Sequence, residues 1–314
     1  MALPMSVVAT ERFSCNEIED SIQRLECYDR LADSSLDEQA AASPEEVESP
    51  LRERIKKEEE LSIVGDFVIM PHRPTYFMPA TYMAETHSEP FHETYGDQAK
   101  NMQNVEAKFQ LSFKVPLWVD IADKDMGLWF GYTQLSLWQL YNSQVSSPFR
   151  ETNYEPELAL AINTDFKLLG MNNTFVVLGL SHQSNGQSEP ISRSWNRLYA
   201  TFVLEHKNIV AYFKPWYRLP EDAEDDDNPD IEKYLGYGEL SLFYKSEKRI
   251  TGLRLWNNLR SSDNRTSVQL DWNFPIKSGF KGYVQFFNGY GETLVDYNYR
   301  TRRLGFGIML TDWF

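Results

Sequence analysis

The sequence predicts an all-β protein, a twelve-stranded antiparallel transmembrane β-barrel that follows a short helical and disordered N-terminal segment. Apolar and polar residues alternate in many segments from residue 106 onward, as in strands with one apolar and one polar face. The segments separated by turn residues number twelve, and single-chain barrels have an even number of strands. The connections between them alternate between short and long, which is typical of barrels in outer membranes.

The N-terminal segment, residues 1–66, differs in composition from the rest of the chain. Residues 1–60 hold 16 acidic and 7 basic side chains, so they carry −9 of the net charge of −15. The sequence SCNE at 14–17 is a capping box, which predicts a short helix with Ile18, Ile22 and Leu25 on one face. Residues 40–60 have almost no core-forming side chains and indicate a solvated tether. We therefore predict an acidic periplasmic segment over 1–66 and a barrel domain over 67–314.

The start of the chain, MALPMSVVAT, contains no charged region followed by a long apolar stretch, so no export signal is visible. Either the protein stays inside the cell, or a signal has been removed and replaced by methionine. Cys15 and Cys27 are the two cysteines. On one unbroken helix they would lie roughly 18 Å apart, beyond disulfide reach. A helical hairpin would allow a bridge, and both arrangements stay open.

The barrel strands are predicted from alternation and from the turns between the alternating segments. In 107–117 the odd-numbered residues are apolar and the even-numbered residues are polar until Pro116. Val268, Leu270, Trp272 and Phe274 alternate in the same way with Gln and Asp and Asn residues. We predict strands near 75–84, 106–119, 127–141, 154–166, 173–184, 195–206, 209–219, 231–246, 250–260, 265–276, 280–291 and 302–314.

Connections and aromatic residues favour a membrane barrel over a soluble two-sheet sandwich, which also predicts alternation. Short turns follow 166, 206, 245 and 276, whereas 85–105, 142–153, 185–194 and 220–230 are longer and polar. Tryptophans near strand ends are expected in the interface girdles of such a barrel. They are Trp118, Trp138, Trp216, Trp256 and Trp313.

Charge and hydropathy exclude several classes. The net charge of −15 argues against a nucleic-acid partner, which would need clustered Lys and Arg. No window approaches 18 consecutive apolar residues, so a transmembrane helix is excluded. The acidic run 221–227 lacks EF-hand spacing and is interpreted as a solvated external loop. His87 and His92 are interpreted as surface residues rather than zinc ligands.

The candidate site lies where one predicted hairpin breaks the alternation. His182 and Ser184 continue the apolar face of Val176, Leu178 and Leu180, and Asn196 shares parity with Leu198 on the returning strand. Three polar residues therefore lie on the lipid side at the external rim. If residue 182 pairs with residue 196, their Cβ atoms are about 4.5–5.5 Å apart, and Ser184 can reach the same imidazole.

Such a trio suits nucleophilic acyl transfer. A serine hydroxyl becomes a good nucleophile when a neighbouring base accepts its proton and a third group orients that base. Asn196 is neutral and cannot stabilise an imidazolium as a carboxylate would, so a modest rate that depends on another electrophile is expected. The alternative is that His182, Ser184 and Asn196 are ordinary rim residues, since H-x-S is a common pattern.

Several motifs in order resemble the bacterial outer membrane phospholipase A family. The resemblance covers residues from about 76 to 314, roughly three quarters of the chain. Its motifs are SSPFRETNYEP at 146–156, the stretch 182–197, KPWY at 214–217, DNPDI at 227–231 and YGE at 290–292. The resemblance implies a twelve-stranded barrel in the outer membrane of a Gram-negative bacterium, with a Ser/His/Asn triad facing the lipid of the outer leaflet.

The resemblance assigns roles to the three residues of the trio. Ser184 would be the nucleophile, His182 the general base and then acid, and Asn196 the orienting member. The amide of Gly186 would help to stabilise the oxyanion of the tetrahedral intermediate. The family acts on glycerophospholipids, and Gln134 matches a family position at the contact between subunits. An interior-facing polar residue is the alternative for Gln134.

The resemblance also implies a Ca²⁺ cofactor in a homodimer. Its ligands would be the carbonyl of Gln187, the hydroxyl of Ser192 and the carbonyl of Ser146 of the partner subunit. Such hard oxygen ligands suit calcium, which can stabilise an oxyanion. Position 187 is often Arg in the family and is Gln here, which leaves a backbone ligand in place but makes the local charge less positive.

The resemblance, together with the trio, implies calcium-dependent, dimer-activated hydrolysis of glycerophospholipid acyl esters, with phospholipase A1, phospholipase A2 and lysophospholipase activities. The substrate would enter sideways from the outer-membrane lipid. The alternative is a non-enzymatic outer-membrane porin or transporter barrel. A soluble β-sandwich binding module is a third possibility.

Overall fold

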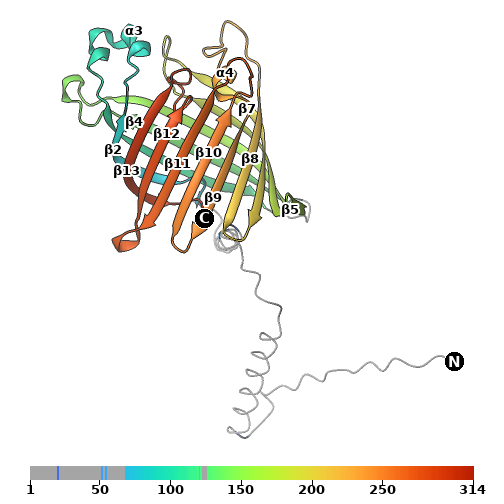
Figure 1. The fold of residues 1–314 in the computed structure, drawn as a ribbon. Coiled ribbons are helices and arrows are strands. Elements are labelled where there is room, and N and C mark those ends of the chain that lie inside the picture. Colours follow the sequence, from blue (N-terminus) through green and yellow to red (C-terminus); the bar gives the residue numbers. More distant parts are fainter. Residues whose placement is uncertain (1–19, 21–50, 52–53, 55–67, 120, 122–125) are drawn as a thin grey trace, which may run out of the picture. The chain divides into compact units, whose positions relative to one another are not determined.

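The computed structural model describes residues 20, 51, 54, 68–119, 121 and 126–314. Twelve long antiparallel strands close into a barrel, because β3 pairs with both β2 and β4 while β13 pairs with β2 (Figure 1). A two-residue strand, β1 (Met70–Pro71), adds to β3. The predicted twelve-stranded transmembrane barrel is therefore confirmed, and the sandwich prediction is not. The barrel strands are β2 (Thr75–Met83), β3 (Val105–Trp118), β4 (Met126–Trp138), β5 (Phe149–Leu168), β6 (Met171–Ser184), β7 (Ser194–His206), β8 (Ile209–Arg218), β9 (Gly238–Ser246), β10 (Arg249–Asn257), β11 (Thr266–Pro275), β12 (Lys281–Gly289) and β13 (Thr301–Thr311).

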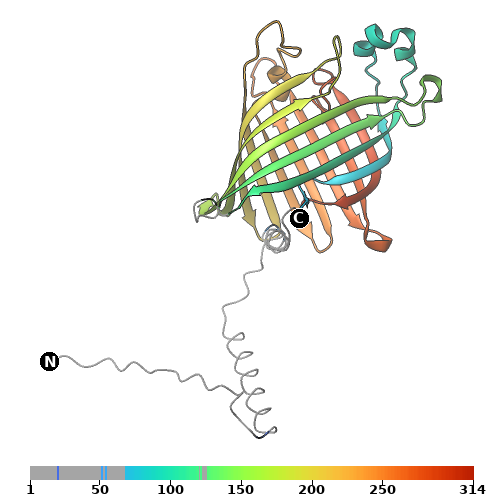
Figure 2. The ribbon, with the colours of Figure 1, turned by 180° about the vertical axis from the view of Figure 1, so that it is seen from behind.

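The alternation read from the sequence separates an apolar outer face from a polar interior. In β11, Leu270 and Trp272 are each 45% exposed on the outside, whereas Asp271 and Asn273 between them are buried. The outer face of a membrane barrel contacts lipid instead of water, so apolar side chains exposed there carry no hydrophobic penalty. Figure 2 shows the long, tilted strands from the opposite side.

Connections alternate in length as predicted. The turns after β5, β7, β9 and β11 are short, and β11 is followed by the 3₁₀ turn η6 (Lys277–Gly279). The long connections gather at the other end of the barrel (Figure 1), which we call the external end by the rule for outer-membrane barrels. They contain η2 (Glu89–Phe91), α3 (His92–Tyr95), η3 (Gly96–Asn101), η5 (Ser143–Val145) and α4 (Glu232–Leu235).

The strand predicted over 231–246 is wrong in its first part. Residues 232–235 form α4, and β9 begins at Gly238. Gly236 ends the helix with a φ of +69°, and a Cβ there would lie 2.1 Å from the carbonyl oxygen of Asn257. Only glycine tolerates both the conformation and the close approach. The strand β5 is longer than predicted, since it begins at Phe149 and ends at Leu168.

The predicted tryptophan girdle is also wrong for three of its five members. Trp216, Trp256 and Trp313 line the barrel interior, whereas Trp118 is 61% exposed on the outside. The indole N–H of Trp216 donates to the carbonyl of Gly236 at 3.0 Å, and that of Trp256 donates to the carbonyl of Tyr290 at 3.0 Å. Inward-facing tryptophans thus find loop carbonyls that the lipid could not provide.

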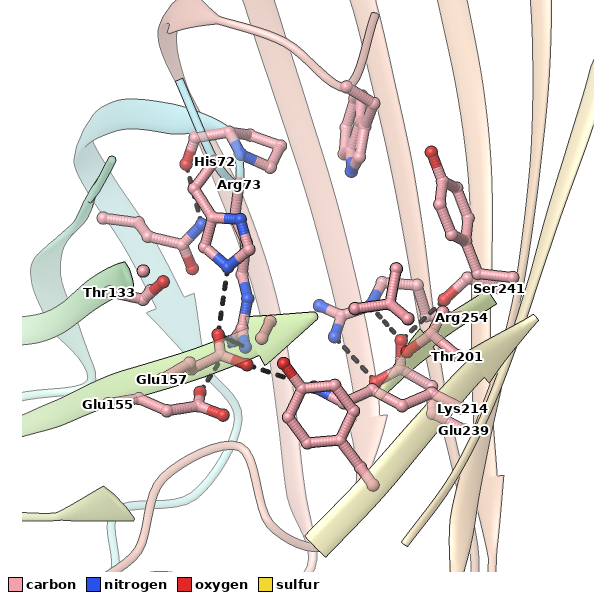
Figure 3. A pocket seen from close by; sticks show the side chains of 18 of the residues that line it. His72, Arg73, Thr133, Glu155, Glu157, Thr201, Lys214, Glu239, Ser241 and Arg254 are labelled. Carbon is pink, nitrogen blue, oxygen red and sulfur yellow. Dashed lines mark hydrogen bonds and ion pairs between the residues drawn. The ribbon is translucent and has the colours of Figure 1, made fainter. Parts of the chain in front are cut away.

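Charged side chains fill the interior around a cavity of about 830 Å³ (Figure 3). Arg73 pairs with Glu155 at 2.7 Å and also with Glu157, and His72 Nε2 lies 3.0 Å from Glu157. Lys214 approaches Glu157 from another strand at 3.5 Å. Buried charges need such partners, so this network explains how strands with polar inner faces form a stable barrel.

Two residues on the N-terminal side of the predicted 66/67 boundary contact the barrel. Leu51 is buried with Val203 and Val210, and Arg54 donates to the carbonyl of Trp313 at 2.6 Å. The boundary itself stays a prediction. Cys15, Cys27 and the helix predicted after the capping box lie outside the described residues. Among the described residues, no helix has the length and apolar character to cross a membrane.

Candidate active site on the outer face of the β6–β7 hairpin

The β6–β7 hairpin places His182 directly opposite Asn196, which is the pairing on which the predicted trio depends. His182 Nδ1 lies 2.9 Å from Asn196 Oδ1. Both residues share the outer face with Leu180 and Leu198, which are 47% and 53% exposed. An amide oxygen accepts only, so this contact places the imidazole proton on Nδ1 and leaves Nε2 free to accept one.

Ser184 follows on the same face, half-buried, at the last position of β6. It lies opposite Tyr154 of β5 and Ser194 of β7. Within the part of the chain that the structure describes, no hydrogen bond joins Ser184 to His182. Catalytic hydrogen bonds are often long before substrate binds, so the arrangement is compatible with a nucleophile beside its base.

The connection after Ser184 is organised by Asn185, which sequence reasoning missed. Its buried side chain accepts from the N–H groups of Gln187 and Arg193 and donates to the carbonyl of Ile191 at 2.7 Å. Gly186 is exposed beside it with a φ of +64°. Asn side chains commonly bridge nearby backbone groups in this way. Asn185 thus holds the candidate oxyanion and calcium residues in one loop.

Ser192 and Gln187, the candidate calcium ligands of this chain, lie on the same loop. Ser192 Oγ donates to Asp227 Oδ2 at 2.6 Å, and the N–H of Ser194 donates to Asp227 Oδ1 at 2.9 Å. Gln187 is exposed. Carbonyl, hydroxyl and carboxylate oxygens are hard ligands, so these residues fit a calcium ion. Clusters of three or more His, Cys, Asp or Glu side chains able to hold a metal are absent from the described residues.

Ser146 lies apart from this loop, in the connection between β4 and β5. Ser146 and Ser147 have left-handed φ values of 61° and 48°. The N–H of Ser147 donates to the carbonyl of Asn142 at 2.8 Å, and the indole of Trp138 donates to the carbonyl of Ser147 at 2.9 Å. Ser146 is exposed at the tip, where a second molecule could reach it.

The acidic run at 221–227 is only partly the solvated loop that the sequence predicted. Residues 222–225 are exposed, but Glu221, Asp226 and Asp227 each accept hydrogen bonds from the site or its supports. Glu221 Oε1 accepts from Asn196 Nδ2 at 2.9 Å. Composition alone did not distinguish these three carboxylates from their neighbours, because all seven positions read as one charged loop.

The prediction that His87 is a surface residue is wrong. Its Nδ1 lies 2.9 Å from Asp296, and its ring stacks on Tyr299 with centroids 4.1 Å apart. Asp296 also accepts from Arg150 at 2.6 Å, and Arg150 pairs with Glu106 at 3.1 Å. Burial alone would raise the pKa of the Asp296 carboxyl, but Arg150 and His87 outweigh burial and hold this pKa below its usual value.

This buried cluster anchors the connection between β12 and β13 inside the external end of the barrel. Leu294, Val295 and Tyr297 of that connection are buried. The N–H of Leu294 donates to Asn153 at 3.0 Å and that of Val295 to Glu151 at 3.1 Å. Leu294 and Tyr297 also pack with Trp195 of β7, so the segment lies in the external end of the interior, behind a strand that carries the candidate site.

Gln134 faces outward. Its neighbours Thr133 and Leu135 line the interior. Gln134 of β4 lies opposite Leu111 of β3, which is 47% exposed. The interior-facing alternative for Gln134 is therefore excluded by the alternation of β4.

Comparisons with known proteins agree with this geometry. The family described as Phospholipase A1 matches residues 51–310. Phospholipase A1 of Klebsiella pneumoniae is 40% identical over 251 residues, which cover 79% of this chain and 84% of that protein.

Two solved structures are also similar. One is an active-site variant of outer membrane phospholipase A from Escherichia coli in which alanine replaces an asparagine. It is 39% identical, with a TM-score of 0.74, and the match covers 80% of this chain and 95% of that one. The other is the outer membrane phospholipase dimer of Salmonella typhi with bound calcium. It is 39% identical, with a TM-score of 0.73, and the match covers 80% and 94%.

Proposed function

Because the chain belongs to the phospholipase A1 family of outer membrane phospholipases, we propose that it hydrolyses acyl esters of glycerophospholipids with Ser184, His182 and Asn196. The observation that carries this proposal is the 2.9 Å contact between His182 and Asn196 on the lipid-facing side of the barrel. The similar Escherichia coli variant, altered at an active-site asparagine, supports an asparagine in this role.

In the first half of the reaction, Ser184 Oγ attacks the ester carbonyl carbon while His182 Nε2 accepts the hydroxyl proton. The tetrahedral intermediate collapses when the ester C–O bond breaks, and His182 gives its proton to the leaving lysophospholipid oxygen. Water then attacks the acyl-enzyme, with His182 again accepting a proton. The second collapse returns that proton to Ser184 Oγ and releases a fatty acid.

The oxyanion of each intermediate would be stabilised near Gly186, whose exposed backbone follows Ser184 by two residues. Gln187 and Ser192 would hold calcium, with Asp227 adding negative charge beside Ser192. Bound calcium would supply a positive charge close to the developing oxyanion. The calcium in the similar Salmonella typhi structure supports this cofactor.

We extend the proposal to a homodimer. Ser146 of the partner subunit would complete the coordination of the calcium ion, and Gln134 would lie at the contact between the two subunits. The outward direction of Gln134 and the exposed tip at Ser146 support this arrangement, as does the dimer in the similar structure. Phospholipids of the outer membrane would then enter sideways from the bilayer, with phospholipase A1, A2 and lysophospholipase activities at the same site.

Fatty-acid release from mixed micelles of phospholipid and detergent tests the proposal. We expect release with calcium, little release with EDTA, and little release from Ser184→Ala with calcium. Release that survives both EDTA and the substitution would contradict the mechanism. A wild-type protein that is inactive with calcium but conducts ions across planar bilayers would favour the porin alternative.

A further inference from the structure

We propose that Glu221 is a positioning residue for the trio, holding the Asn196 amide in its working orientation and supplying the negative charge that asparagine lacks. This inference rests on the proposed function of Ser184, His182 and Asn196. It concerns a residue outside the motifs that suggested that function, on a loop that composition predicted to be solvated.

The geometry is a continuous chain of two hydrogen bonds. Asn196 Oδ1 lies 2.9 Å from His182 Nδ1, and Asn196 Nδ2 donates to Glu221 Oε1 at 2.9 Å. The backbone is fixed too, because the N–H of Leu219 donates to the carbonyl of Asn196 at 2.8 Å. The loop that carries Glu221 therefore begins with a direct tie to the strand that carries Asn196.

The first consequence concerns the direction of the amide. The oxygen and nitrogen of an asparagine side chain have nearly the same shape, and a flipped amide would offer N–H groups to the imidazole. An ionised carboxylate only accepts hydrogen bonds. With Glu221 on one side, the amide nitrogen faces the carboxylate and the oxygen faces His182. The carboxylate thus selects the tautomer with the proton on Nδ1.

The second consequence concerns charge. When His182 accepts the serine proton it becomes an imidazolium, which a neutral asparagine stabilises weakly. Glu221 lies one amide away, and its side chain is only 16% exposed, so solvent screens its charge less than that of a surface residue. Hydrogen bonds in a chain also polarise one another. Glu221 therefore acts on the imidazolium through Asn196 and does not contact it.

The surroundings of Glu221 leave it available for this role. Arg218 Nη2 lies 3.8 Å from Glu221 but 2.6 Å from Asp226. The arginine is thus paired mainly with Asp226, and its contact with Glu221 is long. Arg218 holds the loop in place. Within the described part of the chain, the close hydrogen bond of the Glu221 carboxylate is the one that it accepts from Asn196.

The test compares Glu221→Gln, Glu221→Ala and Glu221→Asp with the matched control Glu224→Gln, an exposed glutamate of the same loop. Removing one member of such a coupled network changes a rate by a factor on the order of ten. We therefore expect kcat to fall about tenfold in Glu221→Gln and further in Glu221→Ala. Glu221→Asp should recover part of the loss, and Glu224→Gln should match the wild type.

Two readouts separate this role from a merely structural one. First, the acidic limb of the pH profile should move to lower pH in Glu221→Gln, because the imidazolium loses a stabilising charge while the glutamine still accepts from Asn196. Second, Glu221→Ala should lower kcat little further when Asn196 is already replaced by alanine, since the carboxylate acts through the Asn196 amide. The KM for phospholipid and the calcium concentration for half-maximal activity should not change.

The outcomes distinguish this inference from the proposed function. An active wild type, an inactive Ser184→Ala and fully active Glu221 variants would overturn the role of Glu221 alone. An equal loss in the Asn196→Ala background would also overturn it, as would a shift only in calcium dependence. A wild type without calcium-dependent activity would instead contradict the proposed function. Urea unfolding of each variant in micelles checks that the barrel is intact.

Discussion

The outer face of the β6–β7 hairpin and the interior behind it use polar residues in opposite ways. On the outside, His182 and Asn196 share one mutual contact, and Ser184 joins neither by a hydrogen bond among the described residues. Inside, Arg150 pairs with both Glu106 and Asp296, and all three side chains are fully buried. The outer residues form no ion pair among the described residues, whereas the inner ones are charged and matched.

The difference indicates that the two faces of the sheet have different tasks: the outer face carries the candidate site, and the inner face stabilises the barrel. Buried ion pairs are costly to break, because removing one partner leaves an uncompensated charge. A trio on the rim costs little to alter. We therefore expect substitutions in the outer trio to change activity and leave stability, and substitutions in the inner ion pairs to do the reverse.

The largest expected effect is on activity. Ser184→Ala should lower kcat by about 10³-fold or more, because the proposed nucleophile is lost. Its free energy of unfolding should stay within about 0.5 kcal/mol of the wild type, as for surface substitutions. Fatty-acid release and urea unfolding measure the two quantities, and Ser188→Ala, an exposed serine of the same hairpin, is the control. A fully active Ser184→Ala variant would contradict the expectation that the outer trio determines activity.

The next largest effect is on stability. Asp296→Asn should lower the free energy of unfolding by about 3 kcal/mol, because it leaves part of the Arg150 charge unmatched inside the barrel. Urea unfolding followed by tryptophan fluorescence measures it. Asp263→Asn, in a carboxylate whose side chain is 55% exposed, should change stability by less than about 1 kcal/mol. Equal effects of the two substitutions would contradict the contrast between interior and surface.

An effect of similar size on stability tests the lipid contact of the outer face. Leu178, which is 46% exposed, lies in the middle of β6. Leu178→Arg should destabilise the barrel by about 2–4 kcal/mol in phospholipid vesicles, because it places a charge in the bilayer. Leu169→Arg, in the β5–β6 turn where Leu169 is 92% exposed, should have little effect. An unchanged Leu178→Arg protein would argue against a bilayer around β6.

The smallest effect is the pH dependence of the inner cluster. Because the folded pKa of Asp296 lies below its usual value of 3.8, its stabilisation is complete above that value and is lost as pH falls through the lower, folded pKa. The stability difference between the wild type and Asp296→Asn should therefore be present above about pH 4 and narrow in more acidic solution. Urea unfolding at several pH values measures it, and a difference that widens in acid would contradict this assignment.

Strand-level features could be predicted because they depend on local alternation. The shared face of His182, Ser184 and Asn196 followed from parity, and the structure pairs His182 with Asn196. Residues whose environment is set by distant segments could not be predicted. His87 meets Asp296 across 209 positions of sequence, and no local pattern indicates that contact. The inward direction of Trp216 and Trp256 is a second example. Their indole N–H groups donate to loop carbonyls that lie 20 and 34 positions further along the sequence.

The site itself divides in the same way. The trio was found because its residues interrupt an apolar face. Asn185, Asp227 and Glu221 were missed because polar residues in polar loops carry no contrast with their neighbours. Their roles are visible only once the loop from 219 to 237 folds back against the loop after β6.

The buried connection between β12 and β13 has a consequence for the membrane as a whole. Leu294 and Val295 occupy the external end of the interior, on the route that small solutes follow through open barrels. An enzyme that works on its outer wall has no need of a passage through its centre. We expect the folded barrel itself to open no route for small solutes, so that it adds no channel to the outer membrane in which it lies.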